Sequence, residues 1–275
     1  MKILHCSDLH GVFPWYEWLV REAPGYDLVC LAGDLLDAGS PGTIPDQMRD
    51  ISVILGRVRT AMAICSGNHD MVHAVDSGPS ALWVQDLRRP GVWTDGDRCE
   101  RQGRRFYCHP WVLPVPVASA GDIWIIHSPP EGTATSQADG SDYDHGDFEF
   151  SELCQSGRGP AIALCGHIHE PRSWNATMGR TLVLNPGWSR DPLVPAHIVL
   201  DLSQRTATRH FPEHPPETVR LPGPTAAEIL GNRTSSQIES LLATTVSNQQ
   251  AEGIPMTPEE IEETRLRLRR LLYEQ

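Results

Sequence analysis

The chain turns polar at Ser7-Asp8-Leu9-His10-Gly11, directly after an apolar, strand-like run, and the same change recurs four more times. The later polar segments are Ala32-Gly33-Asp34-Leu35-Leu36-Asp37, Ser66-Gly67-Asn68-His69-Asp70, His127-Ser128 and Gly166-His167-Ile168-His169. In α/β sheets, ligand sites assemble at the carboxyl ends of strands, and glycines there let the backbone approach a ligand closely. The five segments therefore predict an α/β fold with one polar site at its strand ends.

Around these segments, short β-branched runs alternate with amphipathic stretches, and a strand-rich second half follows. Helices are predicted at residues 15–23, 45–59, 80–88 and 148–155. Strands are predicted at residues 2–6, 27–31, 61–65, 122–126, 161–165, 182–185, 196–201 and 206–211, with a hairpin of 100–101 and 105–109. The alternation predicts a layered α/β domain with mixed sheets.

The chain is predicted to divide into three parts. Residues 1–211 form the α/β domain, the proline-rich residues 212–224 form an extended linker, and residues 225–275 form a helical extension. The extension begins with a helix at 226–242, and Thr257-Pro258-Glu259-Glu260 is a good start for a second one. This last helix either packs back on the domain or mediates oligomerisation or partner docking; its sequence favours neither.

Composition narrows the class of protein. The 275 residues are 40% hydrophobic, and 35 acids against 23 bases give a formal net charge of −12, which disfavours a protein that coats nucleic acid. The chain has seven cysteines, but no two of them have the CxxC spacing, so we do not expect a zinc site with thiolate ligands. No apolar run is long enough to span a membrane, and the N-terminus lacks the features of a signal peptide, so we expect a cytoplasmic protein.

The polar segments carry the residue types that bind divalent metals. They supply carboxylates, one amide oxygen and imidazoles, a mixture that suits Mn, Fe, Zn and similar ions. Asp8 with His10 and His167 with His169 are i,i+2 pairs that a loop can turn toward one site. The donors are too many for one ion, and a bridging Asp34 would complete two four-ligand sets, as in two-metal phosphatases and nucleases.

The ordered motifs D-x-H, GD, GNHD, H and GHxH resemble those of the calcineurin-like metallophosphoesterases, over Met1 to about Phe211. The stretches Ile126-His127-Ser128-Pro129-Pro130-Glu131-Gly132-Thr133 and Asn185-Pro186-Gly187 are most similar to the small prokaryotic phosphodiesterase-like members. The run up to His10 also resembles double-strand-break repair nucleases, without their coiled-coil region. The resemblance implies an αββα sandwich.

It also implies a role for each motif residue. One metal is bound by Asp8, His10 and His169, the other by Asn68, His127 and His167, and Asp34 bridges them. The ions are two divalent metals, manganese in first place, with Fe, Zn, Ni and Co as alternatives. A hydroxide held between them attacks phosphorus in line. His69 contacts the phosphate and protonates the leaving oxygen, and Asp70 orients His69.

Some of these residues have competing structural interpretations. Asp70 is an equally natural acid at a helix N-terminus, and a turn is favoured for Asp37. Packing is favoured over substrate stacking for the aromatic residues near the motifs, and the polar loop of residues 131–145 is either a lid or plain surface. The aromatic residues concerned are Trp15, Tyr16, Trp18, Trp174 and Trp188.

The sequence predicts a phosphoesterase that acts on a small phosphate ester or a nucleotide-type substrate, with diesters favoured over monoesters. A nuclease acting on DNA or RNA ends is the first alternative, and a non-catalytic, metal-stabilised interaction subunit is the second. The first needs a basic patch, for which the candidate residues are Arg57, Arg59, Arg88, Arg89, Arg101, Arg104 and Arg105.

Overall fold

A computed structural model describes residues 1–39, 42–73, 79–111, 113–118, 122–212, 214–222, 242–244, 246–247 and 256–273. The chain divides into two compact units, Met1–Pro222 and Gly223–Gln275. The first unit carries two large mixed sheets, and the second carries the helix α6 (Pro258–Tyr273).

The first sheet has seven strands in the order β15-β14-β13-β1-β2-β3-β6. Strands β1, β2, β3 and β6 run parallel, whereas β13, β14 and β15 join them in antiparallel fashion. The strands are β1 (Lys2–Cys6), β2 (Leu28–Ala32), β3 (Met62–Cys65), β6 (Val92–Trp93), β13 (His197–Asp201), β14 (Thr206–Phe211) and β15 (His214–Arg220).

The second sheet has six strands in the order β11-β12-β10-β9-β8-β7, and it is parallel from β8 to β12. Its strands are β7 (Arg98–Arg101), β8 (Arg104–Cys108), β9 (Ile123–Ile125), β10 (Ile162–Leu164), β11 (Asn175–Met178) and β12 (Thr181–Leu184). A separate two-stranded ribbon consists of β4 (Val72–His73) and β5 (Pro79–Ser80).

Three α-helices cover these sheets: α1 (Phe13–Glu22), α2 (Ile44–Leu55) and α3 (Phe148–Gln155). Short 3₁₀ helices follow α1 at η1 (Ala23–Gly25), β3 at η2 (Asn68–Asp70) and β5 at η3 (Leu82–Leu87). Side-chain caps fix two of the α-helix starts, because Thr43 Oγ1 accepts the Asp46 amide at 3.3 Å and Asp147 Oδ1 accepts the Phe150 amide at 2.7 Å.

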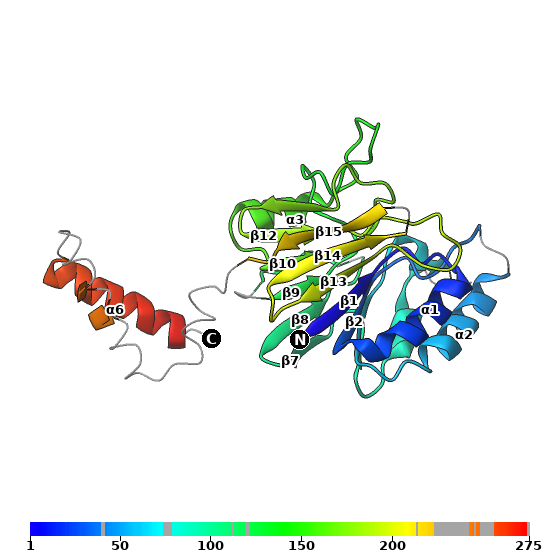
Figure 1. Ribbon diagram of the computed structural model, residues 1–275, viewed down its shortest axis with the longest axis horizontal. Helices are drawn as coiled ribbons and strands as arrows, with labels where there is room; N and C mark the ends of the chain where they lie inside the picture. The colour runs from blue at the N-terminus through cyan, green and yellow to red at the C-terminus, as the bar shows by residue number, and fades with distance from the viewer. Residues whose placement is uncertain are drawn as a thin grey trace. The chain divides into compact units, whose positions relative to one another are not determined.

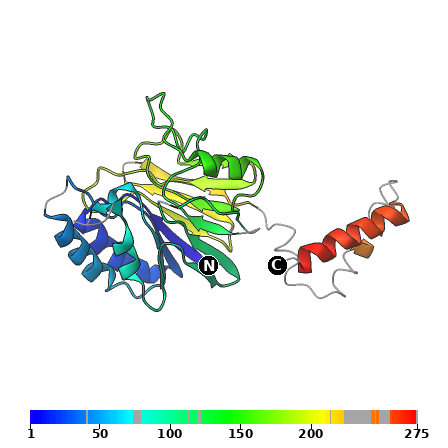
Figure 2. The same cartoon turned by 180° about the vertical axis from the view of Figure 1, so that it is seen from behind.

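Three separate apolar cores hold four layers together. The alternation along β1 sends Ile3 toward the second sheet and Leu4 toward α1 and α2, as period-two burial requires. A third core lies between the second sheet and α3, where Trp124 stacks on Phe150. Helices α1 and α2 therefore lie outside the first sheet and α3 outside the second (Figures 1 and 2). The predicted αββα sandwich with mixed sheets is confirmed.

The structure differs from the sequence-based expectation at several places in this unit, and it adds the unpredicted strands β4, β5, β6 and β11. Residues 80–88 contain a 3₁₀ helix, η3, rather than an α-helix. Within the expected linker 212–224, residues His214–Arg220 form β15 and pair with β14. Prolines are tolerated on an edge strand, whose outer amides need no partner, so an extended proline-rich segment can join the sheet there.

The second unit contains α6, whose start carries a reciprocal cap. The Glu260 amide donates to Thr257 Oγ1 at 3.3 Å, and the Thr257 amide donates to Glu260 Oε2 at 2.7 Å. The helix expected at 226–242 lies outside the described residues except for its last one. The three-part division of the chain stays a prediction. Within the described ranges, no helix has the length and apolar character needed to cross a membrane.

Candidate metal centre

The predicted ligands come from the carboxyl ends of five strands. Asp8 and His10 follow β1, Asp34 follows β2, and Asn68 lies in η2 directly after β3. From the second sheet, His127 follows β9, and the pair His167 and His169 follows β10. Because the sandwich stacks these strand ends against each other, all seven side chains are brought together.

Four of these residues have a left-handed backbone, which side chains other than glycine adopt rarely. The φ angles are 53° at Asp8, 44° at His10, 54° at Asp34 and 72° at His167. Such conformations cost of order 1–3 kcal/mol each and concentrate at functional sites. The turns after β1, β2 and β10 thus have strained backbone at the four residues whose side chains they direct into the site.

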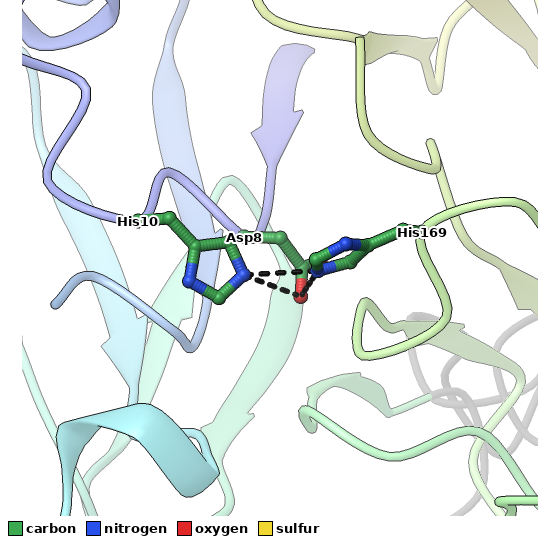
Figure 3. A group of neighbouring side chains, drawn as sticks. All are labelled: Asp8, His10 and His169. Carbon is green, nitrogen blue, oxygen red and sulfur yellow. Dashed lines mark hydrogen bonds and ion pairs between the residues drawn. The ribbon is translucent and has the colours of Figure 1, made fainter. Parts of the chain in front are cut away.

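One group of donors consists of Asp8, His10 and His169 (Figure 3). The Nε2 atoms of His10 and His169 are 2.9 Å apart. Asp8 Oδ1 lies 4.0 Å from the first nitrogen and 3.7 Å from the second. Asp8 also accepts the His167 amide at 3.0 Å, which ties the β1 loop to the β10 loop.

A second group consists of Asn68, His127 and His167. Asn68 Oδ1 lies 3.0 Å from His127 Nε2 and 2.9 Å from His167 Nδ1. Asp34 lies between the two groups: its Oδ2 is 3.3 Å from His127 Nε2 and 3.8 Å from His10 Nε2. The arrangement places one carboxylate within reach of both groups.

The orientation of His127 tests whether a cation fits among these atoms. Its Nδ1 lies 2.7 Å from the carbonyl oxygen of Ala32, which can only accept a hydrogen bond, so Nδ1 carries a proton. The lone pair of a neutral Nε2 would then face the Asn68 and Asp34 oxygens, which are acceptors as well. These oxygens can face Nε2 only with a positive charge among them, either a proton on Nε2 or a metal ion, so the donor set fits a divalent metal in place of that proton.

The pKa values describe the same balance of charge. Burial lowers the pKa of His10, although Asp8 and Asp34 oppose it, and burial together with His127 lowers the pKa of His167 to about 4. Burial alone would raise the pKa of the Asp34 carboxyl, but His127 outweighs it and holds that pKa well below its ordinary value. Burial likewise opposes charge on His127, and Asp34 nevertheless raises its pKa to about 9. A neutral imidazole has the nitrogen lone pair that a metal ligand requires, and the lowered pKa values favour this form of His10 and His167.

At two glycines of the motifs, neighbouring side chains leave no room for a Cβ atom, and neither glycine has a positive φ angle. A Cβ on Gly67 would lie against Asp34 Oδ1 and 2.8 Å from His127 Nε2. A Cβ on Gly166 would lie against Asp8 Oδ2 and 2.7 Å from Ser7 Oγ. Any side chain at these positions would displace the donors themselves.

His69 lies at the exposed rim of the donor cluster, with 41% of its side chain accessible. Its amide donates to Asp34 Oδ1 at 2.8 Å, and its ring meets the His10 ring edge-on at 4.7 Å. Asp37 Oδ1 lies 3.8 Å from His69 Nδ1 and also accepts the Gly39 amide in a local turn. His69 is thus held beside the donors with its ring reachable from solvent.

The hydrogen bonds of Asp70 are directed elsewhere than to His69. Asp70 Oδ1 accepts the amides of Leu35 at 2.9 Å and Leu36 at 3.1 Å, and Oδ2 accepts that of Gly67 at 2.9 Å. Burial and then the nearby Asp34 charge raise the Asp70 pKa to about 7. The geometry supports Asp70 as a buried connection between the β2 and β3 loops, and its role in orienting His69 stays a prediction.

Two tryptophans, Trp111 and Trp188, contact histidines of the donor cluster, and the sequence motifs indicated only Trp188. Trp188 stacks on His169 with ring centroids 5.7 Å apart, while Trp111 lies 5.4 Å from the His127 ring and 5.5 Å from that of His167. Trp111 follows β8 in an irregular segment with no motif beside it, so the sequence holds no signal for it. Of the other aromatic residues considered, Trp15, Tyr16, Trp18 and Trp174 are buried, as packing requires.

Comparison with known proteins bears on the fold and on the family of the chain. No curated protein matches the chain by sequence. The structure is similar to TT1561 of Thermus thermophilus, with a TM-score of 0.53 and 16% identity over 80% of this chain and 99% of that one. It is also similar to the purple acid phosphatase PPD1 from yellow lupin (Lupinus luteus) seeds, with a TM-score of 0.50 and 12% identity over 80% of this chain and 51% of that one. Residues 1–171, which carry every predicted ligand, match the family model of the calcineurin-like phosphoesterases. The chain belongs to the calcineurin-like phosphoesterase family.

Proposed function

We propose that the protein is a binuclear metal-dependent phosphoesterase that hydrolyses phosphodiesters in preference to monoesters. The observation that carries the proposal is the place of Asp34, whose Oδ2 lies between the His10 and His127 nitrogens at 3.8 and 3.3 Å. Asp8, His10 and His169 would hold one metal and Asn68, His127 and His167 the other, with Asp34 shared. Manganese is the preferred metal.

The chemistry that the metals supply when bound is the generation of a nucleophile from water and the neutralisation of phosphoryl charge. The chain's own contribution is to hold the donors in place, through the Asp8 bond to the His167 amide and the Asp34 bond to the His69 amide. His69 is the exposed imidazole that we assign to the ester: it would contact a phosphoryl oxygen and give its proton to the leaving oxygen.

A small substrate fits the charges of the surface better than a long nucleic acid. Several arginines that could have formed a basic patch are paired with acids: Arg57 with Glu17 at 2.5 Å, Arg88 with Asp97 at 2.8 Å and Arg105 with Asp122 at 2.9 Å. Together with the net charge of −12, these pairs weaken the field that would attract a polymer of phosphates. A small phosphate ester or nucleotide-type compound is the proposed substrate.

The test combines metal analysis with two chromogenic esters. The Mn-loaded full chain should contain two metals per chain and hydrolyse bis-p-nitrophenyl phosphate with a higher kcat/KM than p-nitrophenyl phosphate. A single bound metal would contradict the binuclear assignment, and a higher kcat/KM for the monoester would contradict the diester preference. Two bound metals without turnover of either ester would favour the non-catalytic subunit instead.

A further inference from the structure

The Trp111 ring contacts the two imidazoles of one donor group. Its centroid lies 5.4 Å from that of His127 at an interplanar angle of 72°, and 5.5 Å from that of His167 at 46°. His127 is buried and His167 half-buried, whereas Trp111 keeps part of its own surface accessible. A flat apolar surface therefore borders the donor cluster on the side of Asn68, His127 and His167.

The position of Trp111 is tied to the loop that presents Asn68. The Trp111 amide donates to Ser66 Oγ at 3.0 Å, and the Ser66 amide donates to Asp95 Oδ1 at 2.8 Å. Ser66 is 1% exposed and Asp95 is 6% exposed, so these anchors are held within the fold. The hydrogen bond holds the backbone of Trp111, and the contacts with His127 and His167 hold its ring, so the side chain loses little conformational freedom when a ligand stacks on it.

Trp188 lies against the other donor group, that of Asp8, His10 and His169, and its packing differs from that of Trp111. One contact of its ring is to His169, at 5.7 Å and 20°, and another is to the buried Trp15, at 5.7 Å and 61°. Its amide donates to the His169 carbonyl at 2.8 Å, and its indole nitrogen is buried. Trp188 is half-buried, as Trp111 is, but its ring also packs on the core residue Trp15, which makes Trp111 the better candidate for contact with a ligand.

We propose that Trp111 is a specificity-determining residue that stacks on a flat aromatic group of the substrate, so that phosphate esters carrying such a group are preferred. The inference rests on the proposed function, because the phosphoryl group must lie on the metals for the ring to reach Trp111. Stacking on an indole contributes about 1–3 kcal/mol and discriminates poorly between one aromatic ring and another. Trp111 would therefore select aromatic over alkyl esters, and not one base over another.

Two phosphonates that cannot be hydrolysed test this directly. Phenylphosphonate and methylphosphonate share the metal-binding group and differ in the ring, and their affinities for the Mn-loaded full chain are measured by calorimetry. The wild type should prefer phenylphosphonate. Trp111→Ala should reduce that preference by roughly 5- to 150-fold, which is the equivalent of 1–3 kcal/mol, and Trp111→Phe, which keeps a flat ring, should retain most of it.

Phe148→Ala is the matched control, because Phe148 is an aromatic residue 61% exposed at the start of α3, and this variant should keep the wild-type preference. Metal content is measured for each variant to exclude a collapsed site. Equal weakening of both phosphonates in Trp111→Ala, or no weakening of either, would overturn the proposal. An intact phosphonate preference in a wild type that hydrolyses no ester would contradict the proposed function and leave the role of Trp111 standing.

Discussion

The Nε2 atoms of His10 and His169 lie 2.9 Å apart, although 159 residues separate the two histidines in the chain. Two ring nitrogens face each other favourably at such a distance only when a proton or another cation lies between them, since two lone pairs repel. Asp34 Oδ2 lies 3.8 Å from the same His10 nitrogen. The fold therefore assembles donors whose mutual repulsion a cation relieves, and this has measurable consequences.

Metal binding should stabilise the protein, and Asp34 should be required for it. Saturating Mn is expected to raise the Tm by roughly 5–10 °C, and a chelator should reverse the rise. Asp34→Asn removes the carboxylate between the groups, so both the rise in Tm and the activity should be lost. Asp86→Asn, at an exposed position in η3, is the control and should respond to Mn as the wild type does. Normal activity of Asp34→Asn would refute the bridging assignment.

His69→Ala should separate catalysis from metal binding. We expect wild-type metal content and a kcat reduced by roughly 10²- to 10⁴-fold, because a proton donor to the leaving oxygen is lost. The loss should be smaller for esters of acidic phenols, which leave without a proton. His69 also lies within reach of His10 and Asp34 as a metal donor. A fall in metal content in His69→Ala would therefore show that it is a ligand.

Gly67→Ala should lower metal affinity, because its new methyl group would collide with Asp34 Oδ1 and lie 2.8 Å from His127 Nε2. Gly25→Ala provides the control, since a Cβ at Gly25 meets no atom within 4 Å. Titration of the chelator-treated proteins with Mn measures both affinities. Equal affinities in the two variants would show that the close approach at Gly67 does not constrain the donors.

Asp70 should act on stability more than on the chemical step. Asp70→Ala leaves the amides of Leu35, Leu36 and Gly67 without their acceptor, which should cost about 3 kcal/mol or more of unfolding free energy. Asp70→Asn keeps one acceptor oxygen and should be destabilised less. Urea denaturation of the metal-free proteins measures both. If Asp70→Asn had wild-type stability but a kcat reduced as strongly as that of His69→Ala, Asp70 would be a catalytic group.

Two buried histidines away from the metal centre should make the fold sensitive to acid. Burial lowers the pKa of His5 and of His109 to about 4, whereas an unfolded chain has histidine pKa values near 6.5. The unfolded state therefore binds more protons between these limits, and the free energy of unfolding should fall as the pH decreases from about 6.5 to 4.

His109→Phe tests this acid sensitivity, because it keeps the ring packing against Tyr107 and Trp124 and cannot titrate. Urea denaturation with chelator present should show a smaller loss of stability on going from pH 7 to pH 5 than in the wild type. A pH dependence equal to that of the wild type would show that His109 does not contribute.

Patterns of apolar and polar residues predicted the helices and strands whose formation depends on residues nearby in the chain. Short β-branched runs predicted β1 and β14 at their observed bounds, and an amphipathic stretch predicted α3. The edge strand β15 was not predicted. Its prolines indicate an extended backbone, but the sequence does not show whether the edge of a sheet lies beside it. The bonds of Asp70 to the Leu35 and Leu36 amides were not predicted either, since these residues lie 35 and 34 positions away in the β2 loop.

The sequence by itself determined which residue types stand at the strand ends, because chain order and hydrophobic period fix where a strand stops and a polar loop begins. Only the tertiary structure decided which atoms meet: the His10–His169 contact, the place of Asp34 between two groups and the position of Trp111 on His127 and His167. The reason is that these distances are set by the packing of one sheet on the other, across a core to which both sheets contribute. No local stretch of the chain contains that information.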